Sequence, residues 1–496
     1  MHVVERVIII GIDGGTWDVI KPILHELPNL KKIVEGGCHG NLMSTFPPLT
    51  APAWTAAFTG VNPGKNGAYD FFRYENFRRT PISSRDIKYP YIWDTLSKRD
   101  MKTIAISIPL TFPAKDINGV LVTGFGSPGA VDGFATPKEM QKKILEKFPN
   151  YSIDPPHTFD GDAQVYKREI LEIGRQNAEL TKMLLSEYPD WQLLVTVFSS
   201  TDWMQHYFWD DSESILEAYR IVDNFIGWAM ENLLDDGTRF LLMSDHGFEK
   251  KGRVIYINKF LEENGYLKTR KSSSKSLFAR FGGMRSSLRN LDIFKLRRFI
   301  PFSIKEKLPL KKTDTVDYDF DNSKAWMPST SGGGLFVRDK SVLPELISKL
   351  ESLQDPETGT RPIKRVHKGS EIYWGPHSKQ CLDLILEPAR GYEIVENYNT
   401  SWIGSKSSKD RCADHNMKGL FAAYGKDISN TGANLMIWDI AAMTLHMLGL
   451  PLYDDMDGEV SLQTFSEGSR LKSGPKKMKN LKSMRARLSG ARSKKS

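Results

Sequence analysis

Short apolar runs alternate with amphipathic helical patterns along much of this chain, and this alternation constrains its fold more than any other feature. The runs "RVIIIGID", "MKTIAISIP", "WQLLVTVFSS" and "TRFLLMSD" have the composition of buried strands. The patterns "WDVIKPILHEL" and "ESILEAYRIVDNFIGWAM" follow two of them and have the periodicity of helices. The chain is therefore expected to form an α/β fold with a largely parallel sheet. Ligands of such sheets bind at the carboxyl ends of the strands.

The strand and helix pattern is interrupted between about residues 250 and 405 by loops rich in Pro and Gly and by a Ser/Arg/Lys-rich stretch. It resumes with the strand "KGLFAAYG" and the helix "LMIWDIAAMTLHMLG", which Gly449 closes. We expect one core built from residues 1–249 and 405–465, with residues 250–404 inserted as a subdomain. Residues 466–496 are expected to form a disordered basic tail.

Two segments carry most of the positive charge. Residues 469–496 contain eleven Lys and Arg and no acid, and residues 268–312 contain fourteen Lys and Arg against Asp292 and Glu306. The rest of the chain is acidic overall, although the net charge is +8. Such clusters bind polyanions without sequence specificity, and the apolar residues within 268–312 suit an anionic membrane surface. The alternative is that both segments are solvated loops, and the chain has no specific nucleic-acid motif.

The cysteines and the N-terminal residues bear on the compartment. Cys38, Cys381 and Cys412 are too few and too scattered for a disulfide framework or a thiolate zinc site, so any metal must use His, Asp or Glu. The first apolar run is short and has no cleavage site after it, and no run approaches the roughly 18 residues that span a bilayer. We expect a cytoplasmic protein, either free or bound at the periphery of a membrane.

Two motifs place a carboxylate beside an imidazole. In "FLLMSDHGF", Asp245 and His246 stand together where a strand ends, and neither group suits a core without a partner. In "FSSTDWMQHYFW", Asp202 and His206 are four residues apart, so a helix beginning near Ser200 presents both on one face. Such a pair suits Zn²⁺ or a similar divalent ion. The alternative for the second motif is an Asp stabilising the helix dipole and a surface His.

Three further residues are ambiguous when each is taken alone. Asp13 in "IIIGIDGGT" fits a plain turn, and His415 in "RCADHNMKGLFAAYG" fits a solvated loop, as do His157, His367 and His377. Thr50 in "FPPLTAPAWTAAFTG" fits either a helix N-cap or a nucleophile. However, these three residues and the two Asp/His pairs each lie next to a strand end or a helix start of one α/β sheet, so they can converge on one edge. Six metal-type ligands and one hydroxyl are the inventory for two metal ions and a nucleophile.

The ordered set of motifs resembles the alkaline phosphatase superfamily over roughly residues 5–465. The motifs are "GIDGGTWDVI", "FPPLTAPAWTAAFTGVNPGKNGAYDF", "TDWMQHYFW", "SDHGF", "DHNMKGLFAAYG" and "DIAAMTLHMLGLPLYDDMDGE". The match is closest to the type I phosphodiesterase and nucleotide pyrophosphatase group, including its prokaryotic phosphohydrolase or phosphomutase branch. This resemblance implies a three-layer α/β/α core and a cap over the metal edge of the sheet.

The resemblance also implies the role of each site residue. One divalent ion is expected on Asp13, Thr50, Asp245 and His246, and a second on Asp202, His206 and His415. Zinc is usual in the diesterase branch and manganese in the phosphomutase branch. Thr50 is the expected nucleophile, because cation binding lowers its pKa, and it would form a phospho-Thr50 intermediate.

The chain departs from the family pattern near the expected substrate. Nucleotide pyrophosphatases have an Asn 21 residues after the Thr to hold a phosphoryl oxygen, whereas this chain has Phe71, preceded by Asp70. It also reads "GKNG" where prokaryotic relatives often read Gly-Lys-His-Gly. The candidate substrate contacts are therefore Lys65, Asn66, Trp54 and Phe71. For Trp54 and Phe71, core packing is the alternative.

The sequence thus predicts a metal-dependent hydrolase of a small phosphate ester. A phosphomutase of the same superfamily is the second enzymatic possibility, and sulfate ester hydrolysis is less favoured because superfamily sulfatases use a modified Cys or Ser. The non-enzymatic alternative is a scaffold that binds an anionic membrane or nucleic acid through the basic segments.

Overall fold

The computed structural model describes residues 5–75, 78–156, 159, 162–270, 318–329, 333–406 and 410–479. Most of the basic segment 268–312 and the end of the basic tail lie outside these residues, as do the membrane and polyanion contacts predicted for them. His157 also lies outside them. Among the described residues, no helix is both long enough and apolar enough to cross a bilayer.

A nine-stranded sheet forms the centre of the larger unit, in the order β20-β2-β19-β9-β1-β8-β5-β6-β7. Its strands are β1 (Arg6–Ile12), β2 (Cys38–Met43), β5 (Thr103–Ile108), β6 (Gly119–Thr123), β7 (Ala135–Thr136), β8 (Leu193–Phe198), β9 (Thr238–Met243), β19 (Lys418–Tyr424) and β20 (Leu435–Met436). Within this sheet, β19 and β7 run antiparallel to their neighbours, and the other pairs are parallel. The predicted α/β fold with a largely parallel sheet is confirmed.

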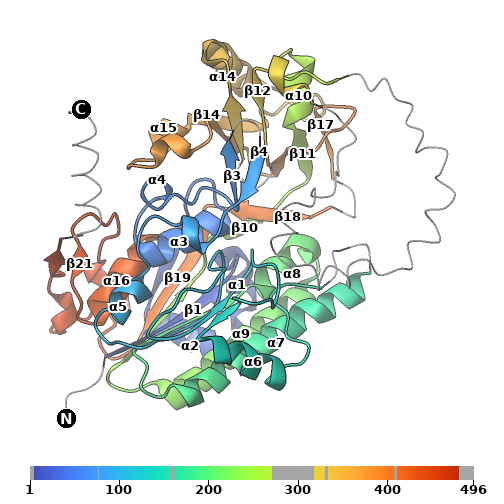
Figure 1. The fold of residues 1–496 in the computed structure, drawn as a ribbon. Coiled ribbons are helices and arrows are strands. Elements are labelled where there is room, and N and C mark those ends of the chain that lie inside the picture. The colour runs from blue at the N-terminus through green and yellow to red at the C-terminus, as the bar shows by residue number, and fades with distance from the viewer. Residues whose placement is uncertain are drawn as a thin grey trace.

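Helices cover both faces of the sheet and make three layers (Figure 1). One face packs against α1 (Trp17–Ile23), α2 (Pro28–Gly36), α7 (Ala163–Glu187), α8 (Ser200–Phe208) and α9 (Ser212–Leu233). The other packs against α3 (Thr50–Thr59), α5 (Ile92–Ser97) and α16 (Asp439–Met447). Successive residues of a strand point to opposite faces, so Ile8 and Ile10 enter the first core, whereas Val7 and Ile9 enter the second. This is why a continuous apolar run marked β1 in the sequence.

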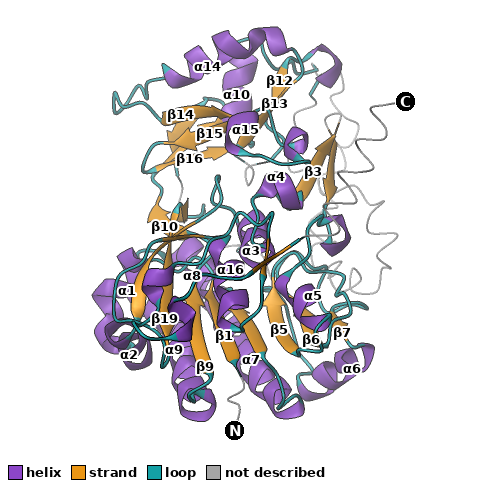
Figure 2. Cartoon of the chain, turned by 90° about the vertical axis from the view of Figure 1, so that its left-hand side faces the viewer, coloured by secondary structure: helices purple, strands orange, loops and turns teal. Residues whose placement is uncertain are grey.

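The smaller unit lies beyond the carboxyl ends of the sheet strands (Figure 2). Its elements are β11 (Arg253–Tyr256), α10 (Ile257–Glu263), β12 (Ala325–Trp326), β13 (Gly334–Val337), α14 (Leu343–Glu351), β14 (Ile363–Lys368), α15 (Gly369–Ile372), β15 (Leu384–Pro388), β16 (Tyr392–Val395) and β17 (Ile403–Ser405). All of them except α15 share a separate apolar core. The short strands β10 (Gly247–Lys250) and β18 (Ala413–Asn416) pair at the junction between the units.

Two elements join the units beside the sheet. The hairpin β3 (Phe72–Glu75) and β4 (Arg78–Pro81) rises toward the smaller unit, and α4 (Pro63–Asn66) lies below it (Figure 1). Tyr373 of the smaller unit donates a hydrogen bond from its hydroxyl to the carbonyl of Phe46 at 2.7 Å. The hydroxyl of Tyr69 donates to the carbonyl of His377 at 2.7 Å. The backbone of His377 therefore helps to hold the two units together at this junction.

The structure differs from the sequence expectation over residues 466–479, which are held against the core. Leu471 is 1% exposed, and its carbonyl accepts a hydrogen bond from Nε2 of His446 at 2.8 Å. Further along, β22 (Lys477–Met478) pairs with β21 (Leu452–Tyr453). One buried leucine and a short strand pairing fix this segment, and neither feature stands out in a Lys/Ser/Gly-rich composition. Residues 480–496 lie outside the described part of the chain.

Candidate metal centre

The candidate site lies where three adjacent strands of the sheet end. Asp13 follows β1, Asp245 and His246 follow β9, and α8 begins two residues after β8 ends. Helix α8 carries Asp202 and His206 at the predicted spacing of one turn. Thr50 is the first residue of α3, and His415 lies on β18. The structure therefore brings all seven predicted residues to one edge of the sheet.

A first group consists of Asp13, Asp245 and His246, which are all essentially buried. Nε2 of His246 lies 3.1 Å from Oδ2 of Asp245 and 3.8 Å from Oδ1 of Asp13. The same nitrogen lies 3.3 Å from the hydroxyl oxygen of Thr50. The Thr50 hydroxyl and the Asp245 carboxylate therefore approach the same imidazole nitrogen.

Thr50 is not the cap of its helix. Leu49 occupies the N-cap position, and no side chain caps the end of α3. The stretch around Thr50 alone fitted both a helix cap and a nucleophile, and the family resemblance implied that the capping residue also attacks. The structure contradicts the capping part, because Leu49 is the N-cap, and it leaves the Thr50 hydroxyl available to the site.

A second group consists of Asp202, His206 and His415. Oδ1 of Asp202 lies 3.5 Å from Nε2 of His206 and 3.4 Å from Nε2 of His415. The two histidine nitrogens are 3.1 Å apart. The groups adjoin, because the rings of His246 and His415 stack with their centroids 3.5 Å apart. His206 and His415 also lie near Asp414, at 3.9 and 3.7 Å from its Oδ1.

Three carboxylate oxygens in the site are buried without a hydrogen bond in the described structure: Oδ1 of Asp13, Oδ1 of Asp202 and Oδ2 of Asp245. Each is the oxygen that faces the histidine nitrogens. A buried carboxylate oxygen that accepts no hydrogen bond is costly, and a divalent cation can satisfy it. Oxygen and imidazole donors without thiolates suit zinc or manganese. The residues present therefore fit divalent cation binding.

The surrounding backbone and hydroxyl groups orient these side chains. Nδ1 of His206 lies 3.0 Å from the carbonyl of Ala413, and Nδ1 of His415 lies 3.1 Å from the carbonyl of Pro48. Donation from Nδ1 leaves each Nε2 free as a ligand atom. The Ser199 hydroxyl donates to Oδ2 of Asp13 at 3.0 Å, and the backbone N–H of Gly14 donates to Oδ1 of Asp245 at 3.1 Å.

Several ionisable side chains are buried close together in this site, and their interactions shift their pKa values. Burial, and then the carboxylates of Asp245 and Asp202, raise the pKa of Asp13 well above its usual value. Burial also disfavours the charged form of Asp202, but His206, His415 and His246 outweigh it and hold the pKa of Asp202 low. Burial, followed by the nearby Arg411 guanidinium, lowers the pKa of His206 to about 3. Neutral His206 is the form that binds a metal.

The four candidate substrate contacts named from the sequence make contacts within the chain. Trp54 is fully buried and stacks on Phe58, which confirms that core packing is its role here. Asn66 is also buried, and its side-chain amide donates to the carbonyl of Val61 at 3.1 Å. Nζ of Lys65 pairs with Asp457 at 2.6 Å.

Phe71 packs edge-on against Phe125 with ring centroids 5.3 Å apart. Trp54 and Asn66 thus contact neighbours in the chain. The partners of Lys65 and Phe71 are distant in the chain, and the sequence could not show them.

Arg411 and Ser199 are site residues that the sequence analysis missed. Nη1 of Arg411 lies 3.3 Å from Nε2 of His206. In the sequence, Arg411 is one basic residue in a charged loop, although its position four residues before His415 is a usable signal. Ser199 ends the apolar run of β8 three residues before Asp202, where a hydroxyl at a strand end was the available signal.

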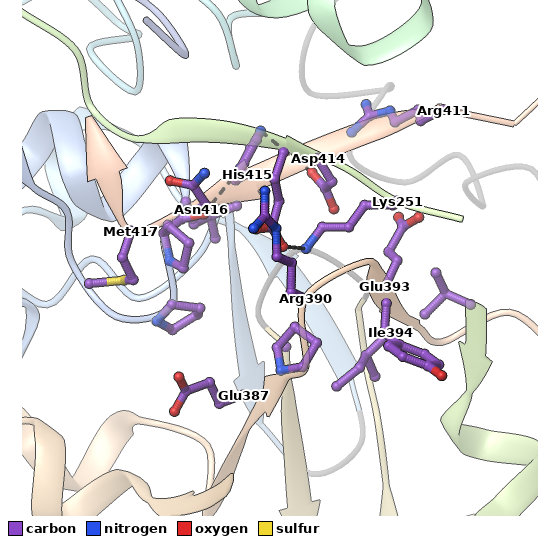
Figure 3. A pocket seen from close by; sticks show the side chains of 18 of the residues that line it. Lys251, Glu387, Arg390, Glu393, Ile394, Arg411, Asp414, His415, Asn416 and Met417 are labelled. Carbon is purple, nitrogen blue, oxygen red and sulfur yellow. Dashed lines mark hydrogen bonds and ion pairs between the residues drawn. The ribbon is translucent and has the colours of Figure 1, made fainter. Parts of the chain in front are cut away.

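A cavity of about 1110 Å³ opens between the two units beside His415 (Figure 3). The core contributes Pro48, Leu49 and the segment from Asp414 to Lys418 to its wall, and the smaller unit contributes residues from β11, β14, β15 and β16. Trp54, Lys65, Asn66 and Phe71 are not among the lining residues. The cavity gives a small molecule access to the edge where the candidate ligands gather.

Comparison with known proteins places the whole arrangement in context. Residues 7–420 match the family described as Type I phosphodiesterase / nucleotide pyrophosphatase. A search of curated proteins gave no match. Among solved structures, murine ectonucleotide pyrophosphatase/phosphodiesterase 5 is similar at 14% identity and a TM-score of 0.53, covering 93% of this chain and 100% of that one.

A second similar structure comes from a bacterium. Phosphonoacetate hydrolase from Sinorhizobium meliloti 1021, in complex with phosphonoformate, has 12% identity and a TM-score of 0.59, covering 90% of this chain and 96% of that one. The murine protein also matches as an inactive form in complex with AMP, at 15% identity, a TM-score of 0.53, and the same coverage of 93% and 100%. At these identities the likeness is one of fold.

Proposed function

Because this chain belongs to the type I phosphodiesterase / nucleotide pyrophosphatase family of the alkaline phosphatase superfamily, a family of phosphohydrolases, we propose that it hydrolyses a small phosphate ester with Thr50 as nucleophile. The observation that carries this proposal is the position of the Thr50 hydroxyl. It lies 3.3 Å from Nε2 of His246, at the edge of a cluster of buried carboxylates whose inward oxygens accept no hydrogen bond among the described residues.

The proposed reaction has two displacements at phosphorus. The oxygen of Thr50 attacks, a P–O bond forms, and the bond to the ester oxygen breaks, which releases the alcohol and leaves phospho-Thr50. Water then attacks the phosphorus, the bond to Thr50 breaks, and the hydroxyl is restored. Thr50 begins a ten-residue helix, and the free N–H groups and dipole of a helix N-terminus favour an incoming phosphate.

Asp13, Thr50, Asp245 and His246 would hold one divalent cation, and Asp202, His206 and His415 the other, with zinc or manganese as the candidates. Bound cations would lower the pKa of the Thr50 hydroxyl and neutralise charge on the phosphoryl and leaving oxygens. The chain's own contribution is to fix the donors: Ser199 and the backbone of Gly14 hold the carboxylates, and main-chain carbonyls hold the imidazoles.

We assign the chemistry to the core of residues 1–249 and 405–465, and the choice of leaving group to residues 250–404 as a cap. The support for this division is spatial. The described part of 250–404 has its own apolar core, and its strands wall the cavity that adjoins His415. A group leaving from a phosphorus near Thr50 would enter this cavity.

The activity is tested with the purified protein on a 4-nitrophenyl phosphodiester and on the corresponding monoester, before and after treatment with a chelator. We expect hydrolysis that is lost after chelation and restored by Zn²⁺ or Mn²⁺, and about two equivalents of metal per chain by elemental analysis. Activity that is indifferent to chelation would contradict the two-metal proposal. The phosphomutase alternative would give an isomerised sugar phosphate without release of free phosphate.

Arg411 takes the place of the missing family Asn in this proposal. In the described structure its guanidinium contacts Nε2 of His206, which is the nitrogen that a cation would bind. With a cation bound there, the guanidinium would be available to a phosphoryl oxygen. Arg411→Ala is expected to lower kcat/KM by about 100-fold. Arg411→Lys is expected to retain only part of the wild-type kcat/KM, since a lysine cannot donate two parallel hydrogen bonds.

Steady-state kinetics of both variants, with bound metal measured on the same samples, tests the role of Arg411. A loss of activity in proportion to lost metal would instead make Arg411 a residue that supports the metal ligands.

A further inference from the structure

The cavity beside His415 contains an arginine with no counter-charge. Arg390 lies in the loop between β15 and β16 and is exposed, and its side chain extends into the cavity toward the strand that carries Asp414, His415 and Asn416 (Figure 3). Among the residues that the structure describes, no carboxylate forms an ion pair with Arg390 and no group accepts a hydrogen bond from it. A guanidinium in this position is available to a bound molecule.

Other cations of the same wall are already neutralised. Nζ of Lys251 pairs with Glu249 at 2.5 Å, and Nζ of Lys364 pairs with Glu387 at 2.6 Å. Lys406 pairs with Glu393. Besides Arg390, two lining residues have a positive charge without an ion pair within the described ranges: Lys418 on the core side of the wall, and Arg411, which contacts His206. The cavity therefore presents positive charge at particular places and not over its whole surface.

The loop that carries Arg390 is fixed in place. The carbonyl of Gly391 accepts hydrogen bonds from the backbone N–H groups of Gly252 at 2.9 Å and Arg253 at 3.1 Å. On the other side, the N–H of Ala389 donates to the carbonyl of Pro362 at 2.9 Å. Arg390 is thus held from both sides at the junction of cap and core, which lowers the entropy cost of using it for recognition.

We propose that Arg390 recognises a second anionic group on the leaving side of the substrate, so that the natural substrate is a phosphodiester or phosphoanhydride whose leaving group carries its own phosphoryl or carboxylate charge. This inference rests on the proposed function, which puts the leaving group in the cavity. A guanidinium fork matches both kinds of anion with two parallel hydrogen bonds.

The test compares three esters that share the same thymidine 5′-phosphoryl group. The leaving group is 4-nitrophenol in the first, 4-carboxyphenol in the second and pyrophosphate, from thymidine triphosphate, in the third. For each ester, kcat/KM of Arg390→Ala is divided by that of the wild type, which removes intrinsic differences in leaving-group reactivity. We expect a loss of about 10–100-fold with at least one charged leaving group and no loss with 4-nitrophenol.

The carboxyphenyl and triphosphate arms show which anion Arg390 selects. Arg365→Ala is the matched control, because Arg365 is an exposed arginine of the same cap that follows the lining residue Lys364 on β14 and does not line the cavity. It is expected to leave all three ratios near one. Thermal unfolding of each variant checks that the cap remains folded, and Arg390→Lys should restore part of the charged-ester activity.

The outcomes separate this inference from the proposed function. Thr50-dependent hydrolysis in which Arg390→Ala affects all three esters equally, or none, overturns the role of Arg390 alone. A wild type that cleaves only the 4-nitrophenyl ester overturns it as well. If none of the three is cleaved but the 4-nitrophenyl monoester is hydrolysed in a Thr50-dependent way, the role of Arg390 fails alone. If the monoester is not hydrolysed either, the proposed function itself fails.

Discussion

Thr50→Ala is expected to lower kcat by at least about 10³-fold with little change in the stability of the fold. The hydroxyl contacts Nε2 of His246 and caps no helix end, so its removal takes away the proposed nucleophile and no structural hydrogen bond of α3. Thr50→Ser retains an oxygen at this place and is expected to keep a measurable fraction of the activity.

A direct readout accompanies the kinetics of the Thr50 variants. Acid-quenched wild-type protein is expected to carry a phosphoryl group on the peptide that contains Thr50, as detected by mass spectrometry, and Thr50→Ala is expected to carry none. Thr55→Ala is the matched control, because the Thr55 hydroxyl donates to the carbonyl of Ala51 at 2.8 Å within the same helix. A Thr50→Ala enzyme that turns over at the wild-type rate would contradict the proposal that Thr50 is the nucleophile.

The sequence was most informative where function follows from local pattern. The apolar runs correctly indicated β1, β8 and β9. Because ligands gather at the carboxyl ends of parallel strands, Asp13, Asp245 and His246 were candidates for one site. The spacing of Asp202 and His206 needed only helical periodicity, and both lie on α8 as predicted. His415 needed the family resemblance, because no local feature separates it from a solvated histidine.

Contacts between distant segments could not be predicted in the same way. Lys65 looked available for a phosphate, but its partner Asp457 lies almost four hundred residues away. No sequence motif contains Arg390, which the fold of the inserted unit places in the cavity wall. In the described part of the tail, Leu471 packs into the core although its neighbours are polar. In each case, tertiary contacts decide a role that composition cannot show.

Asp13→Asn is expected to separate stability from activity. Burial and the nearby carboxylates of Asp245 and Asp202 raise the pKa of Asp13, so the folded metal-free chain binds a proton there more tightly than the unfolded chain does. That contribution to stability is complete below the ordinary carboxyl pKa and is lost as the pH rises through the raised value. Above the ordinary carboxyl pKa, the buried Asp13 of the metal-free wild type therefore costs folding free energy that the neutral amide avoids.

In the presence of chelator at pH 8, Asp13→Asn is expected to unfold roughly 2 °C or more above the wild type, and the difference should shrink as the pH falls toward 5. Added Zn²⁺ or Mn²⁺ should reverse the order, because a ligand that binds only the folded state stabilises the chain with the complete carboxylate set more strongly. The variant should also lose about 10³-fold in kcat/KM, since a neutral amide is a poor substitute for a carboxylate ligand.

Thermal unfolding at both pH values, with and without metal, tests the stability part of this prediction, and Asp18→Asn serves as a control at an exposed aspartate five residues away. A metal-free Asp13→Asn protein less stable than the wild type at pH 8 would show that the carboxylates do not repel one another in the folded chain. The case for a cation site would then rest only on the convergence of the ligands. A more stable, inactive and metal-insensitive variant would instead show that the site keeps an unfavourable cluster of charge because a bound cation needs it.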